Sequence, residues 1–104
     1  MAILDKKLVA GMRTRALAYA GERREVIKLA GDAQHLAKRA IFALHRGDRA
    51  EAGEKLITAE KALQGLSKRY QRVPTLLAEG SYQAALEELV EAQVFYQFVT
   101  TGKM

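Results

Sequence analysis

The fold is decided by residues 22–46, which read ERREVIKLAGDAQHLAKRAIFALHR. Apolar side chains recur there every three or four residues, the spacing that places them along one side of an α-helix. The positions are Val26, Leu29, Ala33, Leu36, Ala37, Ala40, Ile41 and Leu44. We therefore predict a long helix over residues 22–46 whose apolar side packs against other helices.

The same spacing continues toward the N-terminus through Leu8, Met12 and Tyr19. Residues 1–21 are therefore predicted to form an N-terminal helix or extension. Glycine weakens a helix by about 1 kcal/mol relative to alanine. Gly21, which follows Ala20, is accordingly the candidate position for a break before the long helix.

Downstream of the long helix, Gly47 and Asp48 predict a sharp turn. Asp48 is followed three residues later by Glu51, the spacing of a capping box at the start of a helix. A second helix over residues 49–70 is then expected to fold back as an antiparallel hairpin. Pro74 interrupts the helical pattern, and a last helix is predicted over residues 82–100. The whole chain, residues 1–104, is predicted to be one all-α domain, an antiparallel bundle of long helices.

Composition restricts the function classes. The chain has no cysteine, which excludes disulfides and thiolate metal sites. No segment approaches the roughly 20 apolar residues of a membrane span, and charges precede any signal-peptide apolar run. We therefore expect a cytoplasmic location and no membrane partner. The net charge of +5 favours an acidic partner such as nucleic acid, although it is also compatible with an ordinary solubility charge.

The last predicted helix is apolar on nearly every side from Leu89 to Val99. Such a helix is expected to be buried on several sides. A chain of 104 residues has few other elements with which to cover it. We therefore expect the protein to self-associate.

Glu88 and Glu91 lie three residues apart on this helix, so their carboxylates project from the same side. Two such carboxylates can share a hard cation such as Mg²⁺, and a third oxygen ligand from another helix would complete a phosphodiesterase centre. These two glutamates are the candidate catalytic and metal-binding residues. The alternative is an acidic pair on a solvated helix face.

Lys38, Arg39 and Arg46 are the candidate nucleic-acid-binding residues, because they share a side of the long helix with Phe42. Cations in such a stripe contact phosphates without sequence preference. A solvated face between packed helices is the alternative. The sequence contains no nucleophile–His–acid arrangement, glycine-rich phosphate loop or base-stacking aromatic pair.

Two blocks of the sequence together resemble the translin family. The first contains REVIKLAGD at residues 24–32 and AKRAIFALHR at residues 37–46. The second contains ALEELVEA at residues 85–92 and FYQF at residues 95–98, similar to the family's segment LQEYVEA…F..F. The blocks occur in the family's order with a variable helix between them, and the resemblance covers about residues 23–102.

The resemblance implies an all-α bundle about twice this length, of which this chain matches the N-terminal half. It also implies assembly into hollow octamers that bind single-stranded RNA or DNA, as a homo-oligomer or with another translin-family chain. The branch similar to translin-associated factor X carries a Mg²⁺-dependent endoribonuclease site, and its two glutamates match Glu88 and Glu91. The family's third metal-binding carboxylate lies in the second half of the fold. Cleavage is therefore expected only from a complete assembly, with the isolated chain inactive.

Two other interpretations remain open. Gly47 and Gly80 begin similar segments 33 residues apart, close to the 34-residue period of a tetratricopeptide repeat. That spacing favours a helical module that binds a protein partner. The third interpretation is a structural helical oligomer without a ligand.

Overall fold

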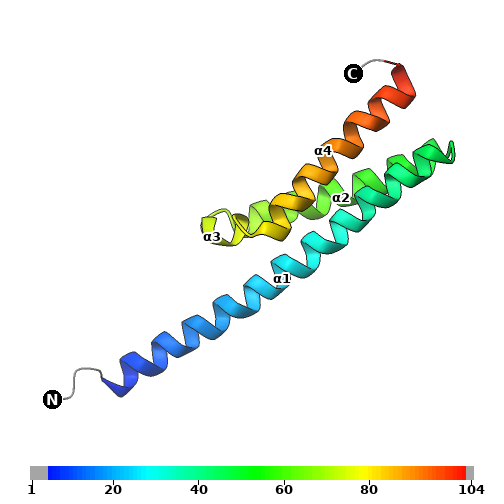
Figure 1. The fold of residues 1–104 in the computed structure, drawn as a ribbon. Helices are drawn as coiled ribbons and strands as arrows, with labels where there is room; N and C mark the ends of the chain where they lie inside the picture. The colour runs from blue at the N-terminus through cyan, green and yellow to red at the C-terminus, as the bar shows by residue number, and fades with distance from the viewer. Residues whose placement is uncertain (1–4, 103–104) are drawn as a thin grey trace.

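The computed structural model describes residues 5–102, and the terminal residues of the predicted domain, 1–4 and 103–104, lie outside this range. Four helices follow one another along the chain: α1 (Lys6–His45), α2 (Arg49–Arg69), α3 (Pro74–Leu77) and α4 (Gly80–Thr101) (Figure 1). Residues 5–102 contain no strand. The prediction of an all-α bundle of long helices is confirmed.

Helix α1 is continuous over 40 residues, so the candidate break at Gly21 is wrong. Its start is capped by Asp5, whose carboxylate accepts a hydrogen bond of 2.9 Å from the backbone N–H of Lys7. Gly21 lies among alanine, arginine and glutamate, all strong helix formers, so one weak position does not interrupt the helix. The long helix therefore begins at Lys6 and not at residue 22.

The turn between α1 and α2 follows the sequence prediction. Gly47 has a φ of 82°, the left-handed conformation that favours glycine after a helix. Asp48 accepts a hydrogen bond of 3.0 Å from the backbone N–H of Glu51. The reciprocal half of the capping box is absent, because the N–H of Asp48 donates to the carbonyl of Ala43 and the Glu51 carboxylate pairs with Arg46. The two helices pack as an antiparallel hairpin.

The connection between α2 and α4 is tied to the middle of α1. Pro74 occupies the first turn of α3, where its missing N–H has no helical partner to lose. The Tyr19 hydroxyl donates to Thr75 at 2.9 Å, and the Arg23 guanidinium lies 3.0 Å from the Glu79 carboxylate. These contacts mark the end of the bundle on α1.

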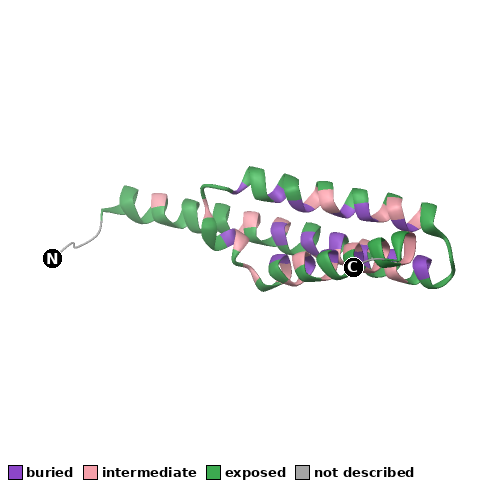
Figure 2. Cartoon of the chain, turned by 90° about the horizontal axis from the view of Figure 1, so that it is seen from above, coloured by how far each residue is buried: buried purple, intermediate pink, exposed green. Residues whose placement is uncertain are grey.

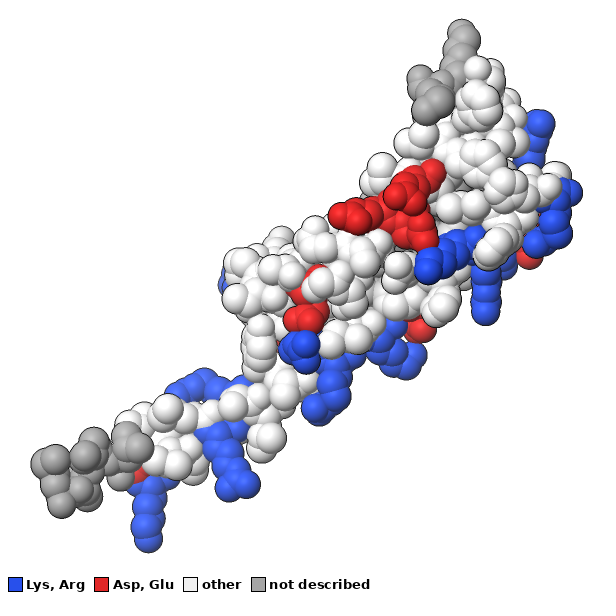
Figure 3. Space-filling view, in the orientation of Figure 1, with Lys and Arg blue, Asp and Glu red and all other residues white. Residues whose placement is uncertain are grey.

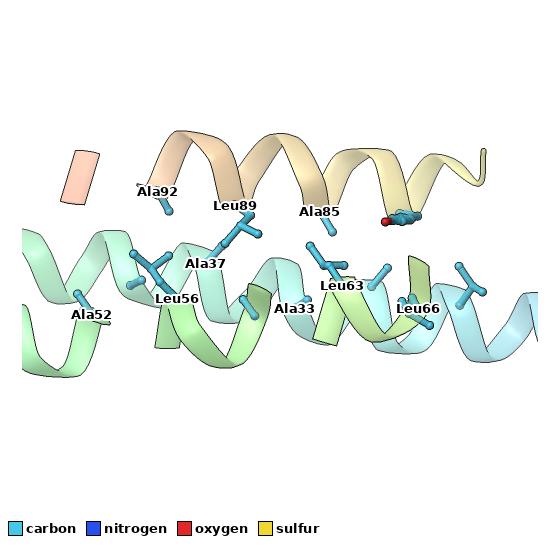
Figure 4. Packing of buried hydrophobic residues seen from close by; sticks show 14 of the residues in the cluster. Ala33, Ala37, Ala52, Leu56, Leu63, Leu66, Ala85, Leu89 and Ala92 are labelled. Atoms are coloured by element: carbon cyan, nitrogen blue, oxygen red, sulfur yellow. The ribbon is translucent and has the colours of Figure 1, made fainter. Parts of the chain in front are cut away.

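The core is lined with alanine. Helix α1 packs against both α2 and α4, which contact each other less. Its buried residues are Val26, Ala30, Ala33, Ala37, Ala40, Ala43 and Leu44. Figure 4 shows Ala85, Leu89 and Ala92 of α4 pointing toward α1 and α2. Small side chains let the helix axes approach closely, and larger residues of α2, such as Leu63 at 2% exposure, fill the space between them.

Helix α4 is buried on one side only. Leu89 and Ala92 lie in the core, whereas Val90, Val94 and Phe98 are 57%, 41% and 48% exposed. The expectation of burial on several sides is therefore not met within residues 5–102. Its helices cover the inner side of α4 and leave the outer side bare.

The molecule is elongated, 71 Å long and 19 Å by 17 Å across. The elongation comes from the N-terminal part of α1, which projects beyond the other helices (Figures 1 and 2). We call residues 6–20 the arm. Apart from Gly11 and Ala20, which are half-buried, the arm residues are exposed.

The four helices contain 40, 21, 4 and 22 residues. A tetratricopeptide repeat fits two helices into 34 residues, so a 40-residue helix cannot belong to one. The similar segments at Gly47 and Gly80 are both helix starts, but the helices that precede them are unlike. The tetratricopeptide interpretation does not agree with this architecture.

Candidate functional site

The structure brings Glu88 and Glu91 to one side of α4, as predicted, but in different surroundings. Glu88 lies against α1, with only 16% of its side chain exposed, and its Oε1 lies 3.9 Å from Nζ of Lys38. Glu91 is exposed. Figure 3 shows acidic side chains gathered on α4 with a basic side chain beside them. Glu88 is therefore the more enclosed carboxylate, although apolar neighbours surround Glu91 in the sequence.

The surroundings of Glu88 raise the pKa of its carboxyl group above the ordinary value. Burial is the largest cause, since it removes water from the charged form. The hydrogen bond with Glu91 and the negative charge of Glu91 raise the pKa further, and the positive charge of Lys38 lowers it. Glu88 therefore holds a proton more tightly than an exposed glutamate, and a cation placed between the two carboxylates would relieve their repulsion.

Glu88 and Glu91 fit the ligand chemistry of Mg²⁺, which prefers carboxylate oxygens and retains several waters. The described residues contain no group of three or more histidine, aspartate or glutamate side chains that could hold an ion. Within residues 5–102, the pair therefore has no third carboxylate. A further ligand would have to come from outside this part of the chain.

The three predicted nucleic-acid-binding residues are divided between two sides of α1. Lys38 faces α4 and pairs with Glu88. Arg39 and Arg46 face α2, where they line a groove with Phe42, Glu51 and Lys55. We call this the Phe42 groove. The sequence prediction grouped all three cations, but Lys38 belongs with the carboxylates.

Glu51 partly neutralises the Phe42 groove. Its carboxylate pairs with Arg46 across the turn, and its Oε1 lies 3.5 Å from Nζ of Lys55. Arg39 has no ion-pair partner among residues 5–102. The groove therefore has a net positive charge of +2, from three cations and one carboxylate.

Phe42 is the functional candidate that the sequence interpretation missed. Its side chain lines the Phe42 groove between Arg39 and Arg46 and is 62% exposed. Exposed apolar side chains are common on protein surfaces, so what distinguishes Phe42 is its position between two arginines. A signal was present in the sequence, because Phe42 follows Arg39 by three residues and precedes Arg46 by four, which puts the ring between the two cations on a helix.

His45 joins α1 to α4. Its ring lies 5.1 Å from that of Phe95, between ring centroids. The contact holds the last turn of α1 against the half of α4 that carries the bare apolar side. His45 therefore has a packing role at this end of the bundle.

No protein-family model, curated protein or solved structure matches the chain. The resemblance to the translin family therefore remains a prediction from two sequence blocks. None of the helices in residues 5–102 is long and apolar enough to cross a membrane.

Proposed function

We propose that the chain binds single-stranded RNA or DNA through the Phe42 groove, as one subunit of an oligomer of the kind that the translin resemblance implies. The observation that carries the proposal is an exposed aromatic ring between two arginines, with a lysine across the groove. Proteins that bind single strands combine cations that follow the backbone with aromatic rings on which bases stack.

The ring favours a single strand over a duplex. A base can stack on Phe42 only when at least one of its two faces is free of a neighbouring base. Every base has such a face, so stacking adds affinity without selecting a sequence. Arg39, Arg46 and Lys55 would contact phosphates with similarly little preference.

The Glu51 carboxylate keeps the expected affinity modest. Arg46 and Lys55 already pair with Glu51, so a phosphate must compete for both cations. Arg39 offers its guanidinium without such competition among the described residues. We therefore expect a dissociation constant in the micromolar range or weaker.

A second candidate function is favoured by the Glu88–Glu91 pair. We infer that these carboxylates contribute two ligands to a Mg²⁺ site in a complete assembly, as the resemblance implies for an endoribonuclease. The support is the placement of Glu88 and Glu91 three residues apart on one side of α4, where burial and then the nearby Glu91 raise the pKa of Glu88. Mg²⁺ bound there would supply charge stabilisation at a scissile phosphate. Another subunit, or further chain, would have to provide the missing ligand.

Fluorescence anisotropy of a labelled single-stranded RNA tests the groove. A stacking contact contributes about 1–3 kcal/mol, so Phe42→Ala should weaken binding about 5- to 100-fold. Ile57→Ala is the matched control, because Ile57 is a 57% exposed apolar side chain on α2 outside the groove. Equal affinity of both variants would exclude Phe42 as a stacking site.

The salt dependence tests the cations separately. Removing one phosphate contact should reduce the slope of log affinity against log salt by about 0.7 on a single strand. We expect this change for Arg39→Ala and not for Lys61→Ala, which removes an exposed α2 cation outside the groove. If the wild-type chain fails to bind RNA even at low salt, the structural-oligomer interpretation is favoured instead.

The metal site is tested in the assembly. Glu88→Gln or Glu91→Gln should abolish Mg²⁺-dependent cleavage of single-stranded RNA and leave RNA binding intact. If the variant with both substitutions cleaved RNA as well as the natural chain, Glu88 and Glu91 would be ordinary surface residues of α4.

A further inference from the structure

The arm continues the buried stripe of α1 into open solvent. Leu8, Met12, Arg15, Tyr19, Glu22 and Val26 follow one another at alternating steps of four and three residues. This spacing keeps them on one side of the helix, the side that is buried from Val26 onward. In the arm, Leu8 and Met12 are 49% and 51% exposed. From Leu8 to Arg15 the arm therefore presents a helix side patterned for packing that no part of the described chain covers.

The arm is also strongly basic. It carries Lys6, Lys7, Arg13 and Arg15, and no acidic residue occurs between Lys6 and Gly21. None of these four cations has an ion-pair partner among residues 5–102. Arg15 lies within the apolar stripe, three residues after Met12 and four before Tyr19. A surface that covers the stripe must therefore offer a carboxylate to Arg15, because an unpaired buried charge is strongly unfavourable.

The outer side of α4 has the complementary features. Val90, Val94, Phe95 and Phe98 form an apolar groove together with Glu91. A neighbouring hollow extends it toward the start of α4 and is lined by Gln83, Leu86, Glu87, Val90 and Glu91. We call the two together the α4 groove. An apolar floor is thus combined with carboxylates, and Figure 3 shows the acidic cluster bordered by uncharged surface, with a basic side chain beside it.

The two surfaces match in length. The 15 residues of the arm extend about 22 Å, and the 16 residues from Gln83 to Phe98 extend about 24 Å. The arm cannot reach the α4 groove of its own chain, because α1 is one unbroken helix that carries the arm away from the bundle. An arm that fills this groove must therefore come from another molecule.

We propose that the arm of one copy docks antiparallel into the α4 groove of a second copy, with Leu8 on Val94, Met12 on Val90 and Arg15 near Glu87. Electrostatic repulsion favours this arrangement over one in which two arms pack against each other. Two arms side by side would bring eight cations together without a carboxylate, whereas the α4 groove supplies Glu87 and Glu91. The inference rests on the self-association proposed above and does not depend on nucleic-acid binding.

Engineered cysteines test the contact, because the natural chain has none. Full-length Met12→Cys and Val90→Cys proteins are mixed in equal amounts and treated with a short thiol cross-linker. We expect the 12–90 product to exceed the 12–12 product at least tenfold. The matched control replaces Val90→Cys by Ile57→Cys, since Ile57 has the same exposure of 57% as Val90 but lies on α2. That mixture should give only background cross-linking.

Charge exchange tests the pairing of Arg15 by sedimentation. Arg15→Glu and Glu87→Arg should each weaken self-association at least tenfold, and an equimolar mixture of the two variants should restore it. Restoration follows because each arm in the mixture can meet an opposite charge in the other protein's groove.

The outcomes separate the docking from the proposed function. Self-association without the 12–90 product, or with the 12–12 product dominant, overturns the docking and leaves self-association standing. A chain that stays monomeric at tens of micromolar overturns both. A monomer whose arm binds vesicles of anionic lipid would make the arm a membrane-surface helix, and this result also overturns the docking.

Discussion

The two halves of α1 carry the same pattern and have different surroundings. From Val26 to Leu44 the stripe is buried by α2 and α4. From Leu8 to Tyr19 the same spacing lies on an exposed arm. Hydrophobic spacing therefore identifies which side of a helix is suited to packing, but it does not tell whether the same chain supplies the partner. Most of the stability of a helix in a protein comes from that packing and not from its own propensity.

The largest expected difference between the two regions concerns leucine truncation. Leu63, 2% exposed, fills the space between the helices, and Leu63→Ala should lower the free energy of unfolding by about 2–5 kcal/mol. Leu17→Ala in the arm, at 65% exposure, should change it by less than about 0.5 kcal/mol. Urea unfolding of dilute protein provides both values. A large loss for Leu17→Ala would mean that the arm is packed even in the monomer.

A smaller difference is expected when glycine is replaced on α1. Gly31 lies in the covered half, and a Cβ there would meet no atom within 4 Å. Gly31→Ala should raise the free energy of unfolding by about 0.5–1 kcal/mol through helix propensity alone. Gly11→Ala in the arm should leave the global value unchanged and increase the helix content of the arm.

Circular dichroism and amide hydrogen exchange separate these two glycine effects. Arm amides should exchange far faster than those of residues 26–44 at low protein concentration, since few buried contacts hold them. If the arm amides of a dilute monomer were as protected from exchange as those of the covered half, the two regions would not differ in stability.

The smallest expected effect compares the covered and bare sides of α4. The pKa of Glu88 is raised in the folded state, so between the ordinary glutamate pKa of 4.5 and the raised value the folded chain binds more protons than the unfolded chain. Protonated Glu88 thus contributes stability that is fully present below its unfolded-state pKa and is lost as pH rises through its folded-state pKa. Glu88→Gln should therefore be more stable than the natural chain at pH 7 and equally stable at pH 4.

Glu87→Gln, on the exposed side of α4, is the control for that comparison. Added Mg²⁺ should raise the melting temperature of the natural chain more than that of Glu88→Gln if the carboxylate pair binds the ion. A Glu88→Gln variant that is less stable at pH 7 would show that the Lys38 contact outweighs burial.

The helices could be predicted because their signals are local. Asp48 caps α2 through a bond to a backbone N–H only three residues away, and that bond is present. The break at Gly21 was wrongly expected because glycine propensity was weighed without its strong helix-forming neighbours. The extent of the bundle could not be predicted, since it depends on distant contacts such as those of Tyr19 with Thr75 and Arg23 with Glu79.

The candidate site was predictable to a lesser degree. The spacing of Glu88 and Glu91 predicted a shared side, and the structure has it. Their relative burial could not be predicted, because Glu88 is covered by Lys38 and α1, which are distant in sequence, while Glu91 on the same helix stays exposed. Lys38 was grouped with Arg39 because the two residues are adjacent in the sequence. Adjacent residues on a helix point about 100° apart, and here they face different partners.

Five of the seven buried residues of α1 are alanines. An alanine side chain has no rotamers to lose when it becomes ordered, whereas leucine or methionine gives up conformational entropy on burial. The seam between α1 and α4 thus forms with almost no entropic penalty from the α1 side, even though each methyl group removes little area from water. The same seam cannot absorb a larger residue by choosing another rotamer, so it allows few substitutions and holds the two helices at one separation.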